Sequence, residues 1–188
     1  MSRASSDIAA TILDTPGWAS ALGAIAVVLG VFLTALHANE VMKQYVVTAA
    51  MPADGVMPPA DCPAEELEEE GLSRAECEYM VAHVAGIALS SPAWFPRAQI
   101  VLALTGMTLG FVSIIIGGAL VNYSPSASLA AVLVFGGLAG VDALQFAAVV
   151  NTGPILRDVY LWQVLLWFLI HLMMTAAAIA GRDSEASR

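Results

Sequence analysis

Asp142 and His171 are ionisable residues that lie within two long apolar stretches of the chain. A charge near the centre of a bilayer costs about 2.5–3.5 kcal/mol on insertion scales, so such residues usually face other helices and find a partner. Asp142 lies ten residues before Thr152, and His171 lies eleven residues after Tyr160. At 1.5 Å per residue, two antiparallel helices place both about 15 Å from their shared turn. We therefore predict that Asp142 and His171 interact near the membrane midplane.

This pair allows two interpretations. In the functional one, it relays a proton or coordinates an ion or polar ligand, because histidine titrates nearest to neutral pH. In the structural one, it holds two helices together through interhelical hydrogen bonds worth about 0.6–2 kcal/mol. A single pair makes an incomplete pathway, and the sequence leaves both interpretations open. The nearby polar candidates are Gln145, Gln163 and Thr175.

Other site chemistries find less support in the sequence. A haem held by two histidines is disfavoured, because His37 falls at the outer end of the first apolar stretch and His171 falls in the middle of the last. His83 has no second ligand at metal-binding spacing, so no metal site is expected. Phosphate-binding, hydrolase and metalloprotease motifs are absent from the sequence. We expect neither a catalytic residue nor a cofactor, and a haem- or quinone-linked redox role is the weakest hypothesis.

The composition indicates an integral membrane protein. Of 188 residues, 59% are hydrophobic and 12% charged, and the mean hydropathy is +0.77. Runs of about 20 apolar residues without period-two alternation predict spanning helices, hence an all-α bundle of four transmembrane helices. The predicted spans are 17–38, 98–121, 129–150 and 159–180, joined by a loop at 39–97 and turns at 122–128 and 151–158, with end segments 1–16 and 181–188.

The first span is interpreted as a retained anchor and not as a signal peptide, because its apolar run exceeds the usual 7 to 15 residues. Cleavage after Ala38 is the alternative. Charge counting does not decide the orientation. The two cysteines, Cys62 and Cys77, both lie in the 39–97 loop and fit one disulfide formed in an oxidising compartment. We therefore expect this loop outside a multi-pass cell membrane, with both termini in the cytoplasm.

The loop contains a predicted amphipathic helix near 74–89. Ser73 followed by Glu76 is a capping-box signature, and an apolar face follows it at helical spacing: Cys77, Met80, Val81, Val84 and Ile87. The preceding acidic run would bind cations or a basic partner, or would simply form a solvated helix face. It comprises Glu65, Glu66, Glu68, Glu69 and Glu70.

Small residues recur at helical spacing in three spans, which is how membrane helices approach closely. We expect the first two stripes to pack on each other or on a partner subunit. The stripe of the first span is Ala19, Gly23, Ala26 and Gly30, and that of the second is Ala103, Gly106, Gly110, Ser113 and Gly117. In the third span, Gly136 and Gly140 form a small face opposite Asp142.

The order of elements resembles that of claudins and tetraspanins, but the chain lacks the W-GLW-C-C pattern of the former and the C-C-G of the latter, so we assign no family. A net charge of −9 argues against nucleic acid as a partner. The composition suggests a GC-rich prokaryote. Our first hypothesis is a non-catalytic accessory subunit that docks on membrane-protein partners, or on further copies of itself, within the lipid bilayer through its helix faces and acidic loop. The alternative is a proton- or ion-conducting component centred on Asp142 and His171.

Overall fold

The structure, a computed structural model, describes residues 17–50, 59–122, 124 and 126–186. The predicted segment 1–16 and parts of the 122–128 turn and the 181–188 tail lie outside these residues. The described residues form six helices and no strand, which confirms the all-α prediction. The helices are α2 (Gly17–Ala50), α3 (Ala64–Glu70), α4 (Arg74–Ser90), α5 (Phe95–Val121), α6 (Ala127–Val150) and α7 (Pro154–Ala186).

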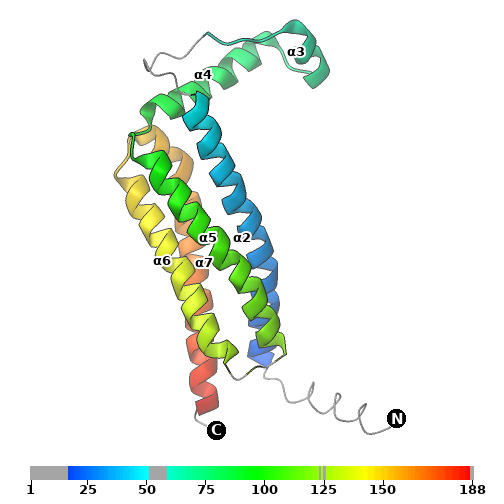
Figure 1. Cartoon of the computed structure of the whole chain (residues 1–188), viewed down its shortest axis with the longest axis vertical. Coiled ribbons are helices and arrows are strands. Elements are labelled where there is room, and N and C mark those ends of the chain that lie inside the picture. Colours follow the sequence, from blue (N-terminus) through cyan, green and yellow to red (C-terminus); the bar gives the residue numbers. More distant parts are fainter. Residues whose placement is uncertain (1–16, 51–58, 123, 125, 187–188) are drawn as a thin grey trace, which may run out of the picture.

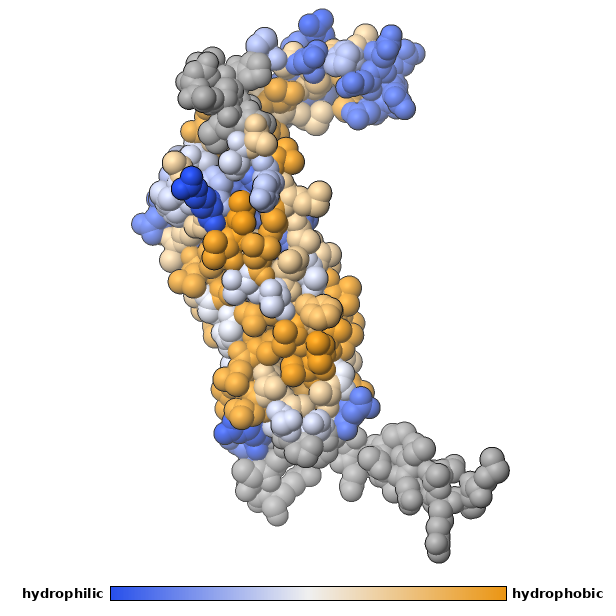
Figure 2. All heavy atoms as spheres, viewed as in Figure 1, coloured by the Kyte–Doolittle hydropathy of each residue, from blue (hydrophilic) through white to orange (hydrophobic). Residues whose placement is uncertain are grey.

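Four of these helices, α2, α5, α6 and α7, are long and apolar enough to cross a membrane, which fits a multi-pass membrane protein. They run side by side, and α4 lies across one end with α3 at its tip (Figure 1). The start of α2 and the end of α7 lie at the opposite end. Hydrophobic residues cover the visible face of the long helices, and hydrophilic residues gather at α3 (Figure 2).

Two helices extend well beyond the predicted spans. Helix α2 continues to Ala50, since no glycine or proline interrupts the polar stretch after residue 38. Helix α7 begins at Pro154, in a position where a proline costs no helical hydrogen bond, and continues to Ala186. Hydropathy marks only the apolar part of a helix, so the predicted boundaries stop short. As a result, residues 37–44 belong to the same rigid helix as the first apolar stretch.

The small residues of α2 and α5 lie against each other. A Cβ atom at Gly23 would come within 2.6 Å of the Gly117 carbonyl oxygen, and one at Gly30 within 2.8 Å of the Gly110 oxygen. Ser113 Oγ donates a hydrogen bond of 3.2 Å across this contact to the α2 backbone. All members of both stripes are buried. Close backbone approach therefore joins α2 to α5.

The small face of α6 is not closely packed against another described helix. Gly140 is exposed, and nothing in the described chain lies within 4 Å of where its Cβ would be. Gly136 meets only Thr175, at an ordinary 3.9 Å. Helix α6 packs through its bulkier face, where Phe135 and Leu138 are buried, so packing by Gly140 within this chain is not observed.

The predicted disulfide between Cys62 and Cys77 is confirmed, with Cα atoms 6.2 Å apart. In the chain-entropy model, closing a loop of this length is worth about 3 kcal/mol. The bridge ties α4 to the segment before α3. The acidic side chains of α3 are all exposed, as in a solvated helix face.

Helix α4 starts at the expected capping box. Ser73 Oγ accepts from the Glu76 backbone N–H, and the Ser73 backbone N–H donates to the Glu76 carboxylate. The apolar face of α4 is not buried against other helices, as it would be in a typical amphipathic helix. Met80 and Val84 are exposed, and Ala88 is the buried residue of the helix. The reason is that α4 crosses the end of the long helices, where Ile87 packs against the apolar cluster around Phe95.

Candidate functional site

Asp142 of α6 and His171 of α7 form a buried hydrogen-bonded pair. His171 Nδ1 lies 2.5 Å from Asp142 Oδ2, and the two residues are 0% and 2% exposed. The Trp167 ring stacks on the imidazole with a centroid distance of 5.9 Å. Thr175 Oγ1 donates its hydrogen to the His171 carbonyl oxygen, one turn away, and therefore does not donate to the imidazole. The imidazole is therefore held in place from two sides.

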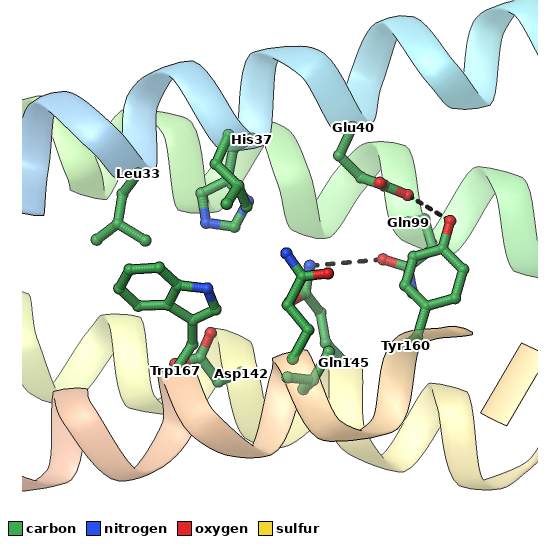
Figure 3. A pocket seen from close by; sticks show the side chains of 11 residues that line it. Leu33, His37, Glu40, Gln99, Asp142, Gln145, Tyr160 and Trp167 are labelled. Carbon is green, nitrogen blue, oxygen red and sulfur yellow. Dashed lines mark hydrogen bonds between the residues drawn. The ribbon is translucent and has the colours of Figure 1, made fainter. Parts of the chain in front are cut away.

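Asp142 also lies on the wall of a cavity of about 40 Å³ between the long helices (Figure 3). Leu33 and Trp167 line the cavity at the level of the pair. By volume, the cavity holds about three water molecules. The polar residues that line it come from all four long helices: His37 and Glu40 from α2, Gln99 from α5, Asp142 and Gln145 from α6, and Tyr160 and Gln163 from α7.

His37 belongs to this cavity, which corrects the sequence argument about depth. His37 is 4% exposed and lies within electrostatic reach of both Asp142 and His171. Gly106 makes room for it, because a methyl group at that position would collide with the imidazole. The longer α2 explains the difference, since it carries His37 well inside the helix. Unequal depth is thus no argument against a haem.

Glu40 forms the cavity's partly exposed end. Its Oε1 accepts from Tyr160 Oη at 3.0 Å and from Gln44 Nε2 at 2.7 Å. Lys43 Nζ lies 3.6 Å from the other carboxylate oxygen and 4.4 Å from the centroid of the Tyr160 ring. Side-chain exposure is 15% for Glu40 and 40% for Lys43. These contacts hold the carboxylate where the cavity approaches the surface.

Two amides cross the middle of the cavity. Gln145 Nε2 donates a long hydrogen bond of 3.4 Å to Gln99 Oε1. Gln99 is 1% exposed, and its own Nε2 has no hydrogen-bond partner in the described chain. A buried hydrogen-bond donor without a partner costs free energy of folding. The unpaired Nε2 therefore indicates that a water molecule or ligand bound in the cavity accepts its hydrogen bond.

The predicted supporting residues differ in their roles. Gln145 lies in the cavity, Gln163 is exposed at its rim, and Thr175 bonds only to the backbone. Sequence reasoning missed Glu40, Gln99 and Tyr160. One signal for α2 was available: positions 37, 40 and 44 are spaced three and four apart, so they share a helix face.

Apolar clusters lie on both sides of the cavity. Toward the far end of the helices, a cluster that includes Leu33, Phe135, Leu138 and Met174 fills the space between α2, α6 and α7. Toward α4, Phe95 packs with Val149, Leu156 and Tyr160. The polar path from Glu40 therefore ends at His171 and does not continue to the far end.

No family model, no curated protein and no solved structure matches this chain. Within the described ranges, three or more histidine, cysteine or carboxylate side chains nowhere gather in a way that could hold a metal ion. The chemistry of the site itself therefore carries the functional argument.

Proposed function

We propose that this chain is a membrane protein that takes up a proton at the Asp142–His171 pair from the side of the 39–97 loop. The observation that carries the proposal is that Asp142 both bonds to His171 and lines the polar cavity. One of its oxygens bonds to His171, and the residue lines a polar cavity that reaches the partly exposed Glu40. A pair that only locked two helices would need no such connection.

The pair is suited to exchange a proton, because its protonation states each carry an energetic cost. With one proton between them, the pair carries a negative charge in a medium of low dielectric constant. With two protons the pair is neutral, but in the tautomer that places a hydrogen on His171 Nε2 this buried atom has no partner in the described chain.

The proposed uptake is one-sided. The apolar cluster around Phe135 separates the pair from the far end, so a single copy offers no continuous polar route through the membrane. A proton bound at Asp142 would return to the loop side or pass to a partner subunit. On this proposal the chain acts as a proton-binding subunit of a larger assembly, without catalysis or a cofactor of its own.

For orientation, we propose that the four long helices form a transmembrane bundle in a cell membrane, with the loop outside and the termini in the cytoplasm. The Cys62–Cys77 disulfide supports this orientation, because such bridges persist in oxidising compartments. Protons would then enter from outside.

Infrared difference spectroscopy of the full chain in lipid bilayers tests the proposal. On a change of pH, the wild type should show the carbonyl band of one buried carboxylic acid. Asp142→Asn should remove this band. Asp158→Asn, the same chemical change at an exposed position of α7, should keep it. Identical spectra for the wild type and Asp142→Asn would refute proton uptake at this pair.

We propose accessory-subunit docking as a second function, supported by the open small face of α6. Gly140 is exposed with free space in front of it, as expected where another membrane helix approaches. Purification of the tagged protein in mild detergent should recover a membrane partner or a homo-oligomer, and Gly140→Leu should release it. The matched control is Gly118→Leu on α5, where a Cβ also meets nothing. Equal recovery from both variants would exclude docking through this face.

A further inference from the structure

The cavity beside Asp142 combines a small volume with a buried hydrogen-bond donor that lacks a partner. Its volume of about 40 Å³ corresponds to about three water molecules. Gln99 lines the cavity, and its Nε2 has no acceptor in the described chain. A cavity that is polar and large enough for water, beside a buried donor without a partner, meets the conditions for ordered internal water.

The acceptors at the two ends are also in place. At the inner end, Asp142 lines the cavity and uses Oδ2 for His171, while Oδ1 has no hydrogen bond to the described chain. At the outer end, Glu40 lines the same cavity through a side chain that is 15% exposed. A water that accepts from Gln99 Nε2 can donate to a carboxylate oxygen of Asp142 or Glu40.

We infer that the cavity binds a chain of about three water molecules that connects Glu40 to Asp142, with Gln99 as its anchor. The inference rests on the proposed proton uptake and names its route. Protonated Glu40 gives its proton to the first water, each water passes one proton to the next, and the Asp142 carboxylate receives one. Only O–H bonds form and break, and no electrons are transferred.

In this route Glu40 is the entry group, and Gln99 is a positioning residue that exchanges no proton. Tyr160 and Gln44 both donate to Glu40 Oε1 and keep the carboxylate at the mouth of the cavity. Trp167 and Leu33 close the inner end, so the waters have no exit toward the far half of the helices.

The experiment measures the rate of deuterium exchange at the Asp142 carboxyl band in bilayers after a switch to heavy water. Glu40→Gln and Gln99→Met should each slow the exchange at least tenfold while leaving the band itself in place. The controls make similar changes outside the cavity: Glu78→Gln on α4 and Thr108→Val on the exposed face of α5. Both should exchange at the wild-type rate.

The outcomes separate the two proposals. Absence of a carboxyl band in the wild type that is lost in Asp142→Asn would overturn proton uptake. A band that exchanges equally fast in Glu40→Gln, Gln99→Met and the controls would overturn the water chain and leave proton uptake standing. The wild type provides a test that needs no variant. Magnetisation should pass from water to the Gln99 side-chain nitrogen in solid-state NMR, and its absence would equally overturn the chain.

Discussion

The half of the long helices next to α4 and the half at the far end are built from the same four helices but packed by different forces. The loop-side half buries hydrogen-bonding side chains, among them Gln44, Gln99, Gln145 and Asp142. Among the described residues, the far half buries mainly apolar side chains around Phe135, together with the close backbone contact of α2 with α5, where Ser113 Oγ donates to the α2 backbone. Lipid is as apolar as leucine, so helices in a membrane associate through close packing and interhelical hydrogen bonds. Close packing dominates in the far half, whereas hydrogen-bonding side chains line a cavity in the loop-side half.

The largest expected effect comes from breaking the buried pair. His171→Leu leaves the Asp142 carboxyl without its partner and should destabilise the fold by about 3–5 kcal/mol. Adding Asp142→Leu to the same chain should restore most of this loss, because no uncompensated polar group remains. Reversible unfolding in mixed detergent micelles measures both. If the double variant were as unstable as the single one, the pair would not be an energetic unit.

In the far half, Phe135→Ala should cost about 3 kcal/mol through the cavity it creates, since the ring is 0% exposed. The carboxyl band of Asp142 should remain, because the apolar cluster does not take part in proton binding. Unfolding and infrared measurements on one sample test whether the stability of the far half and the carboxyl band of Asp142 are independent. Loss of the band at unchanged fold would show that the two halves are coupled.

Substitutions at two glycines compare a helix face that is packed against another helix with one that is exposed. Gly23→Ala should destabilise by about 1–3 kcal/mol, because its Cβ would come within 2.6 Å of the rigid Gly117 carbonyl oxygen. Gly140→Ala meets no atom and should be neutral or stabilise by up to about 1 kcal/mol through helix propensity. Unfolding of the isolated chain ranks the two. A reversed order would contradict the packing of α2 on α5.

The smallest effect is expected outside the long helices, at the start of α4. Hydrogen bonds from the Ser73 side chain and backbone hold the pKa of Glu76 below its ordinary value of 4.5. A lowered pKa means that the capping box stabilises α4 fully above the ordinary value and loses this contribution as the pH falls through the lowered one. Amide exchange of the first turn of α4 should therefore quicken in acid, and Ser73→Ala should weaken this pH dependence, because only the backbone hydrogen bond to Glu76 remains. If Ser73→Ala kept the full pH dependence of amide exchange, a group other than the capping box would be its cause.

Much of the fold could be predicted from the sequence, because its signals are local. Twenty-residue apolar runs predict spanning helices, and the small-residue spacing of Gly23 and Gly30 predicts a close helix contact. The Ser73–Glu76 spacing predicts a cap, and two cysteines in one loop predict a bridge. The loop-side polar cavity was only partly predictable. Asp142 and His171 stand out against apolar neighbours, whereas His37, Glu40 and Gln99 fall near the ends of apolar stretches, where polar residues are ordinary.

By itself, the sequence determined the helical class, the number of candidate spans, the disulfide and the unusual placement of Asp142 and His171, since each depends on residues near one another in the chain or on composition. Only the tertiary structure decided that α2 continues far enough to carry His37 and Glu40 to the same cavity as Asp142. It also decided that Gln99 lacks a partner and that the small face of α6 stays open. These properties depend on how four helices meet in space, and contacts between residues more than 100 positions apart, such as Glu40 and Tyr160, leave no local trace in the sequence.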